Sequence, residues 1–201
     1  MSESNNSNSN IITTVNKDSA DGFFKVRIHT ITPLKPLSFD LFIKVGAQRV
    51  LYLRAGDYLT KEKIAGLEAR DSGGHFMVQE KDRRSYKSYV HDHMTSNDLN
   101  TKDKAFLLRE SSMTLVEEIF ENPDVHQALN QARPIIQDFV GFMQSEPEAM
   151  QHLISLSGHD FYTYNHSLDV SIYSLGLGEA LGYSKKELEE LGIASIFHDI
   201  G

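Results

Sequence analysis

The chain has 201 residues, of which 40% are hydrophobic and 24% charged, and its formal net charge is −8. This composition is typical of globular proteins with one large or two small domains, and the acidic balance argues against a dedicated nucleic-acid binder. The chain has no cysteine, which excludes disulfides and thiolate metal sites, and it has no run of roughly 18 apolar residues that could span a membrane, so we expect a cytoplasmic protein without a membrane partner.

The first part of the chain changes from polar to alternating. Residues 1–21 are rich in serine and asparagine, which predicts a disordered tail without the basic and apolar segments of a secretory signal. From Phe23 the pattern predicts a strand, and residues 39–45 and 49–54 predict a hairpin around a turn at 46–48. These features indicate that a folded domain begins near residue 22.

The next segments complete a small α+β unit. Thr60 is placed to cap a helix that opens at Lys61. A further strand is predicted at 75–78 and a second helix at 80–93. His91 and His93 could chelate a metal, but their place at a helix end favours a solvated pair. We interpret residues 22–94 as an α+β sensory or interaction domain.

The rest of the chain reads as helical. Residues 95–100 form a polar linker, and residues 101–201 are predicted to form an all-α domain. Asp124 is placed to cap one helix, and Pro134 predicts that this helix is kinked or split. Two final helices are predicted at about 160–181 and 184–199, the second opened by a Ser184–Glu187 capping box, and the glycines of Gly176-Leu177-Gly178 favour close helix packing.

Three residues on the last two helices are candidate metal ligands. His166 lies on the first helix, and the adjacent His198 and Asp199 lie at the end of the second. If the helices pack antiparallel, the two imidazoles and the carboxylate meet and can bind a divalent metal. The alternatives are a hydrogen-bonded core histidine at 166 and a helix-end cap at 198. Asp169 is interpreted as a structural residue.

These residues also carry a family resemblance. The run Tyr162-Thr163-Tyr164-Asn165-His166-Ser167, with Leu181-Gly182-Tyr183-Ser184 and Phe197-His198-Asp199-Ile200-Gly201, resembles the front half of an HD-GYP domain. The resemblance covers roughly the C-terminal half of the chain. It implies a truncated HD-type helical domain with a two- or three-metal centre that hydrolyses cyclic di-GMP in the intact protein. It implies His166, His198 and Asp199 as ligands, and it favours iron or manganese as the metal.

The departure from the family pattern leads to a second expectation. An HD-GYP domain continues with a lysine, further His and Asp ligands, and the Gly-Tyr-Pro segment, and none of these is present. We therefore expect a truncated piece that binds metal weakly and is inactive by itself. The alternative function is a non-enzymatic signalling module, which binds a protein partner or forms a homodimer through its helical domain.

Overall fold

The structure is a computed structural model, and it describes residues 14–15, 22–68, 76–121, 124–146, 148–157 and 163–199. The chain forms two compact units, Met1–Lys87 and Ser88–Gly201, and each is described by itself. The first unit is α+β and the second is all-helical, as predicted. The division between the two units falls inside the helix Arg83–Thr95. The domain boundary predicted at residues 95–100 stays a prediction.

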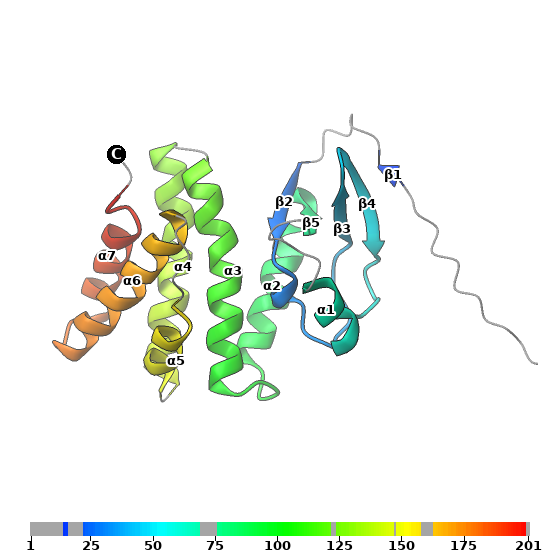
Figure 1. The fold of residues 1–201 in the computed structure, drawn as a ribbon. Coiled ribbons are helices and arrows are strands. Elements are labelled where there is room, and N and C mark those ends of the chain that lie inside the picture. Colours follow the sequence, from blue (N-terminus) through cyan, green and yellow to red (C-terminus); the bar gives the residue numbers. More distant parts are fainter. Residues whose placement is uncertain are drawn as a thin grey trace, which may run out of the picture. The chain divides into compact units, whose positions relative to one another are not determined.

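An antiparallel sheet forms the centre of the first unit (Figure 1). Its strands lie in the order β1-β4-β3-β5-β2, and their bounds are Thr14–Val15 (β1), Phe23–Val26 (β2), Leu41–Val45 (β3), Gln48–Leu53 (β4) and Phe76–Gln79 (β5). The predicted hairpin is present as β3 and β4, and its turn needs Gly46, whose φ of 61° is in the left-handed region. Of the predicted disordered tail, the structure describes only Thr14 and Val15, which pair with β4.

Helices flank this sheet. Helix α1 (Lys61–Glu68) is capped by Thr60, whose Oγ1 accepts a hydrogen bond from the Lys63 amide. Short 3₁₀ helices occupy Ile28–Thr30 and Glu80–Asp82, and α2 (Arg83–Thr95) follows the second of them. The ring of Tyr86 on α2 lies edge-on against two phenylalanine rings, Phe24 and Phe39, at 5.5 Å from each. These aromatic contacts fix the start of α2 against the sheet unit.

The second unit contains helices α3 (Thr101–Glu121), α4 (Val125–Ser145), α5 (Ala149–Ser155), α6 (Thr163–Ala180) and α7 (Lys185–Ile196). Asp124 caps α4 as predicted, accepting a hydrogen bond from the Gln127 amide. Of the two outcomes predicted for Pro134, a split is wrong, because α4 continues through it as a single helix, and a kink stays a prediction. Pro134 and Asn130 are exposed, so the carbonyl that the proline leaves without a helical partner can bond to water.

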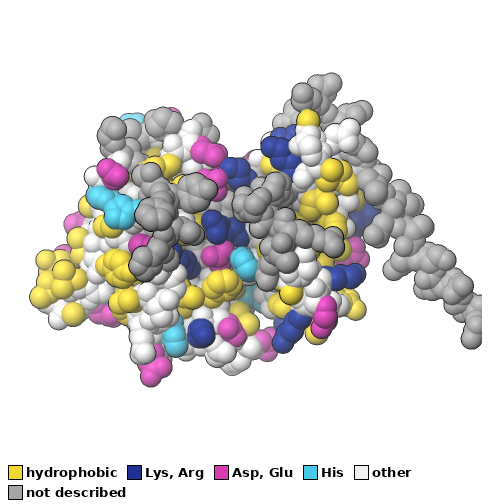
Figure 2. All heavy atoms as spheres, in the orientation of Figure 1, with side chains coloured by type: hydrophobic (Ala, Val, Ile, Leu, Met, Phe, Trp, Pro, Cys, Tyr) yellow, Lys and Arg dark blue, Asp and Glu magenta, His cyan; other side chains and the backbone are white. Residues whose placement is uncertain are grey.

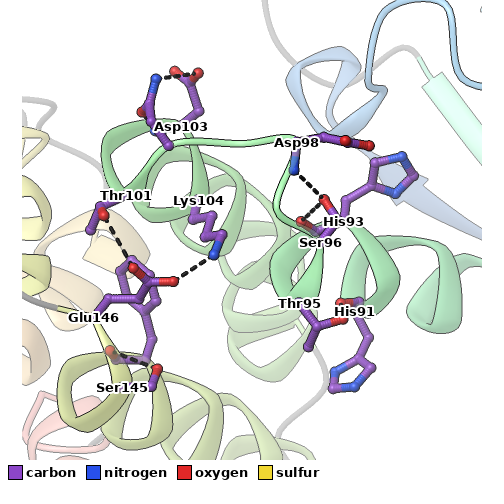
Figure 3. Close-up of polar contacts among 12 residues, drawn as sticks. His91, His93, Thr95, Ser96, Asp98, Thr101, Asp103, Lys104, Ser145 and Glu146 are labelled. Atoms are coloured by element: carbon purple, nitrogen blue, oxygen red, sulfur yellow. Dashed lines mark hydrogen bonds and ion pairs between the residues drawn. The ribbon is translucent and has the colours of Figure 1, made fainter.

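Short-range hydrogen bonds order the turn between α2 and α3 (Figure 3). The Ser96 hydroxyl donates to the His93 carbonyl, and Asn100 caps α3 through the Asp103 amide. His93 packs on Tyr89, with its Nδ1 2.6 Å from the Tyr89 carbonyl oxygen. His91 is exposed, and its ring points away from the ring of His93 (Figure 3). The pair at 91 and 93 is therefore not arranged to chelate a metal.

A partly buried ion pair joins the start of α3 to the end of α4. Lys104 Nζ lies 2.5 Å from Glu146 Oε1, and the Thr101 hydroxyl donates to the other carboxylate oxygen (Figure 3). The hydrogen bond from Lys104 lowers the pKa of Glu146 below its ordinary value of 4.5. Because the folded state favours the ionised carboxylate, the pair stabilises the fold above pH 4.5, and this stabilisation is lost as the pH falls further.

Glu146→Gln is expected to lower the free energy of unfolding at pH 7 by about 1–3 kcal/mol, because Lys104 is left buried without its charged partner. The difference between variant and wild type should shrink as the pH is lowered from 5 towards 3. Urea unfolding at several pH values measures it. Glu190→Gln is the matched control: its pair with Lys186 is exposed and 3.8 Å long, so a change under about 0.5 kcal/mol is expected. A pH-independent difference for Glu146→Gln would contradict the assignment.

Candidate metal centre

The connection between α6 and α7 makes the two helices antiparallel neighbours. Gly182, with a φ of 79°, ends α6 in the left-handed conformation that a side chain would strain. Ser184 then opens α7 through the predicted capping box: its Oγ accepts from the Glu187 amide, and the Glu187 carboxylate accepts from the Ser184 amide. The turn thereby directs α7 back along α6, and these two helices make the most extensive contact in the helical unit (Figure 1).

Close packing at Gly192 sets the register of α7. A Cβ atom at this position would lie 2.7 Å from Ile136 Cγ2 on α4 and 3.1 Å from Leu175 Cδ2 on α6, so only glycine fits without a shift. The Ser171 hydroxyl on α6 donates a 3.0 Å hydrogen bond to the Gly192 carbonyl. The predicted close packing at Gly176 and Gly178 is also present, against Met150 and Leu188 respectively.

This register brings His166 and His198 together. Their ring centroids lie 5.2 Å apart, with an angle of 63° between the ring planes. His166 is in the first turn of α6, and His198 lies just past the end of α7, in the turn that follows Ile196. Both residues are exposed, and Figure 2 shows histidine side chains at the surface near the end of α7. The two rings are therefore open to a ligand from solvent.

A backbone contact orients the ring of His198. Its Nδ1 lies 2.8 Å from the Ser195 carbonyl oxygen. Since a carbonyl can only accept, Nδ1 carries the hydrogen, and the neutral ring has its lone pair on Nε2. Histidines that bind metals are commonly oriented by such a bond from the other ring nitrogen.

Asp199 does not complete a three-ligand group. It is exposed at the end of the described chain, and among the described residues no group of three or more His, Cys, Asp or Glu side chains is arranged to hold a metal ion. The structure thus places two of the predicted ligands side by side, and the assignment of all three as ligands stays a prediction. Tyr162, Ile200 and Gly201 of the motif lie outside the described residues.

One turn along α6 from His166, Asp169 forms a buried ion pair with Arg109 of α3. Arg109 Nη1 lies 2.5 Å from Asp169 Oδ1, and the two side chains are 6% and 10% exposed. Two neighbouring side-chain oxygens on α6, Asn165 Oδ1 and Ser167 Oγ, are buried without a hydrogen-bond partner within the described part of the chain. No role for Arg109 was predicted from the sequence. An arginine in the apolar stripe of one helix and an aspartate on another apolar helix are opposite charges at positions expected to be buried, which is the signal that could have indicated this pair.

No helix among the described residues is both long and apolar enough to cross a lipid bilayer.

Comparisons with known proteins fit this arrangement. No protein-family profile matches the chain. A curated relative, the cyclic di-GMP phosphodiesterase PA4108 of Pseudomonas aeruginosa, is 28% identical over 99 residues, which are 48% of this chain and 24% of the relative. A solved structure also matches, that of Bd1817, a HDG"Y"P protein from Bdellovibrio bacteriovorus. The match covers 89% of this chain and 60% of the Bd1817 chain, with a TM-score of 0.64 and 22% sequence identity.

The structural match shows a shared fold, which includes the predicted HD-type helical domain, and the curated match covers about half of this chain. In both comparisons the matched residues span less than two thirds of the known protein. Together they confirm the relationship predicted from the sequence: the chain resembles the HD-GYP proteins over part of their length.

Proposed function

We propose that this chain is part of a metal-dependent phosphodiesterase that hydrolyses cyclic di-GMP, with His166, His198 and Asp199 as ligands of a divalent metal. The observation that carries the proposal is the 5.2 Å approach of the two imidazoles, one on α6 and the other in the turn after α7. The name of the curated relative supports the substrate class. The exposed position of both rings agrees with a ligand that arrives from solvent.

The residues present fit a metal in part. The Nε2 atom of His198 has its lone pair available, because Nδ1 is bonded to a backbone carbonyl. His166 supplies a second imidazole, and Asp199 a carboxylate from the adjacent residue. Imidazole and carboxylate donors suit iron or manganese. A bound metal supplies a Lewis acid that lowers the pKa of water and neutralises phosphate charge.

The proposal includes weak binding and no hydrolysis by the 201-residue chain. Two or three ligands leave most coordination positions of iron or manganese to water, and affinity rises with the number of protein ligands. Among the described residues, the packing of α7 on α6 holds the two histidine rings side by side, ready for a metal.

The proposal is tested by titrating the chain with Mn²⁺ and following the broadening of the histidine ring signals by nuclear magnetic resonance. The signals of His166 and His198 should broaden first, and His166→Ala should weaken binding by at least about 10-fold because it removes a direct ligand. His152→Ala is the control, since His152 lies on α5 and not on α6 or after α7. Equal broadening of all histidines, or unchanged affinity in His166→Ala, would reject the proposed site.

A second candidate function is the non-enzymatic module that forms a homodimer. Figure 2 shows hydrophobic side chains gathered at the connection between α6 and α7, where Leu177, Leu181 and Tyr183 are exposed. Exposed apolar patches of this kind are found at protein interfaces. Light scattering after size exclusion measures the mass: a dimer that Leu181→Gln dissociates favours this function, and a monomer at all concentrations excludes it.

A further inference from the structure

We propose that Arg109 and Asp169 are positioning residues for His166: their buried ion pair fixes the rotation of α6 about its own axis, so that His166 faces His198. This inference rests on the proposed function for its consequence, metal binding. Its structural content, the placement of one ring beside the other, can be measured without metal.

The placement of the pair supports this role. Asp169 follows His166 by three residues, so the two side chains project from adjacent turns of α6. The pair connects α6 to α3, whereas the Ser171–Gly192 hydrogen bond connects α6 to α7. Arg109 Nη1 and Asp169 Oδ1 are buried and make no hydrogen bond in the described structure, so both atoms depend on the charge contact between them.

Apolar burial alone selects the rotation of α6 poorly. Leu168 and Ile172 are buried, yet Tyr173 and Leu177 on the opposite side of the same helix are apolar and exposed. A rotated α6 would exchange one apolar surface for another. The charged pair removes this ambiguity, because any rotation that separates Asp169 from Arg109 leaves a buried charge without a partner.

The test compares pairs of charge-removing substitutions. Arg109→Met with Asp169→Leu replaces the ion pair by apolar side chains, an exchange that often preserves stability. In the metal-free chain, the nuclear Overhauser effect between the ring protons of His166 and His198 reports their approach. We expect this signal to be lost in the double variant while the unfolding midpoint stays near that of the wild type, and Mn²⁺ affinity to fall by at least about 10-fold.

Three further variants keep the result interpretable. Lys104→Met with Glu146→Leu removes a different ion pair of α3, one that joins the end of α4 and not α6, and it should leave the Overhauser effect unchanged. Asp169→Asn keeps the shape of the side chain and loses its charge, and it replaces the double variant if that variant fails to fold. Asp169→Glu, which retains the charge, should preserve the effect in part.

An unchanged Overhauser effect in folded Arg109→Met/Asp169→Leu, or in folded Asp169→Asn, would overturn the inference. Failure of the proposed function is distinguishable from this outcome. If the wild-type chain binds no Mn²⁺ but the ring contact is lost in the variants, the positioning role holds and the metal site is rejected.

Discussion

Gly192→Val is expected to lower the free energy of unfolding of the helical unit by about 3 kcal/mol, through overpacking where α7 meets α4 and α6. A Cβ atom at this position already lies 2.7 Å from Ile136 Cγ2, and valine adds two methyl groups. Ile136 and Leu175 are fully buried, so their side chains have little room to move away. Urea unfolding followed by circular dichroism at 222 nm measures the loss.

The same substitution should disturb the candidate site. To relieve the overlap, α7 must move away from α4 and α6, which stretches the 3.0 Å hydrogen bond from Ser171 to the Gly192 carbonyl. Because His198 lies two residues after the end of α7, its ring is expected to move with the helix. We therefore expect the Overhauser effect between His166 and His198 to weaken in Gly192→Val under conditions where the variant is still folded.

Another glycine provides the control. Gly141 lies inside α4, and a Cβ atom there meets no atom within 4 Å. Gly141→Ala should therefore raise the free energy of unfolding by up to about 1 kcal/mol, which is the difference in helix propensity. Combining Gly192→Val with Ile136→Ala should cost less than the sum of the two single changes, by about 1–2 kcal/mol. Strict additivity would show that the two positions do not touch.

The elements that were predicted correctly depend on local signals. The Ser184–Glu187 capping box and the cap at Asp124 each involve residues three apart, so the sequence contains the complete interaction. The turn at Gly46 is similar, since a hairpin with a left-handed glycine is defined within a few residues. Such features are readable without knowledge of the tertiary fold.

The contacts that place the candidate ligands are not local. Arg109 and Asp169 are far apart in the sequence, and nothing in either segment shows that α3 lies beside α6. The hydrogen bond between Ser171 and Gly192 likewise depends on the pairing of two helices. The sequence predicted that His166 and His198 lie together as metal ligands, because the family resemblance implies that role for both. The packing that brings them together had to be observed.

Phe139→Ala is expected to lower the free energy of unfolding of the helical unit by about 3–5 kcal/mol, because it opens a cavity in the centre of the core. Phe139 lies on α4, is fully buried and is among the largest side chains without solvent exposure. It belongs to the same hydrophobic cluster as Leu168 of α6 and Ile196 of α7, so the cavity weakens the support of both helices that carry the histidines.

The size of this effect distinguishes the truncation of a buried side chain from the truncation of an exposed one. Leu177→Ala also truncates a large apolar side chain, but Leu177 is 63% exposed, so a change within about 0.5 kcal/mol is expected. Phe139→Leu retains most of the buried volume and should fall between the two. Denaturant midpoints for the three variants give this order directly. A loss below about 1 kcal/mol in Phe139→Ala would mean that α4 does not form the centre of the helical unit, and the register that joins His166 to His198 would then lack its support.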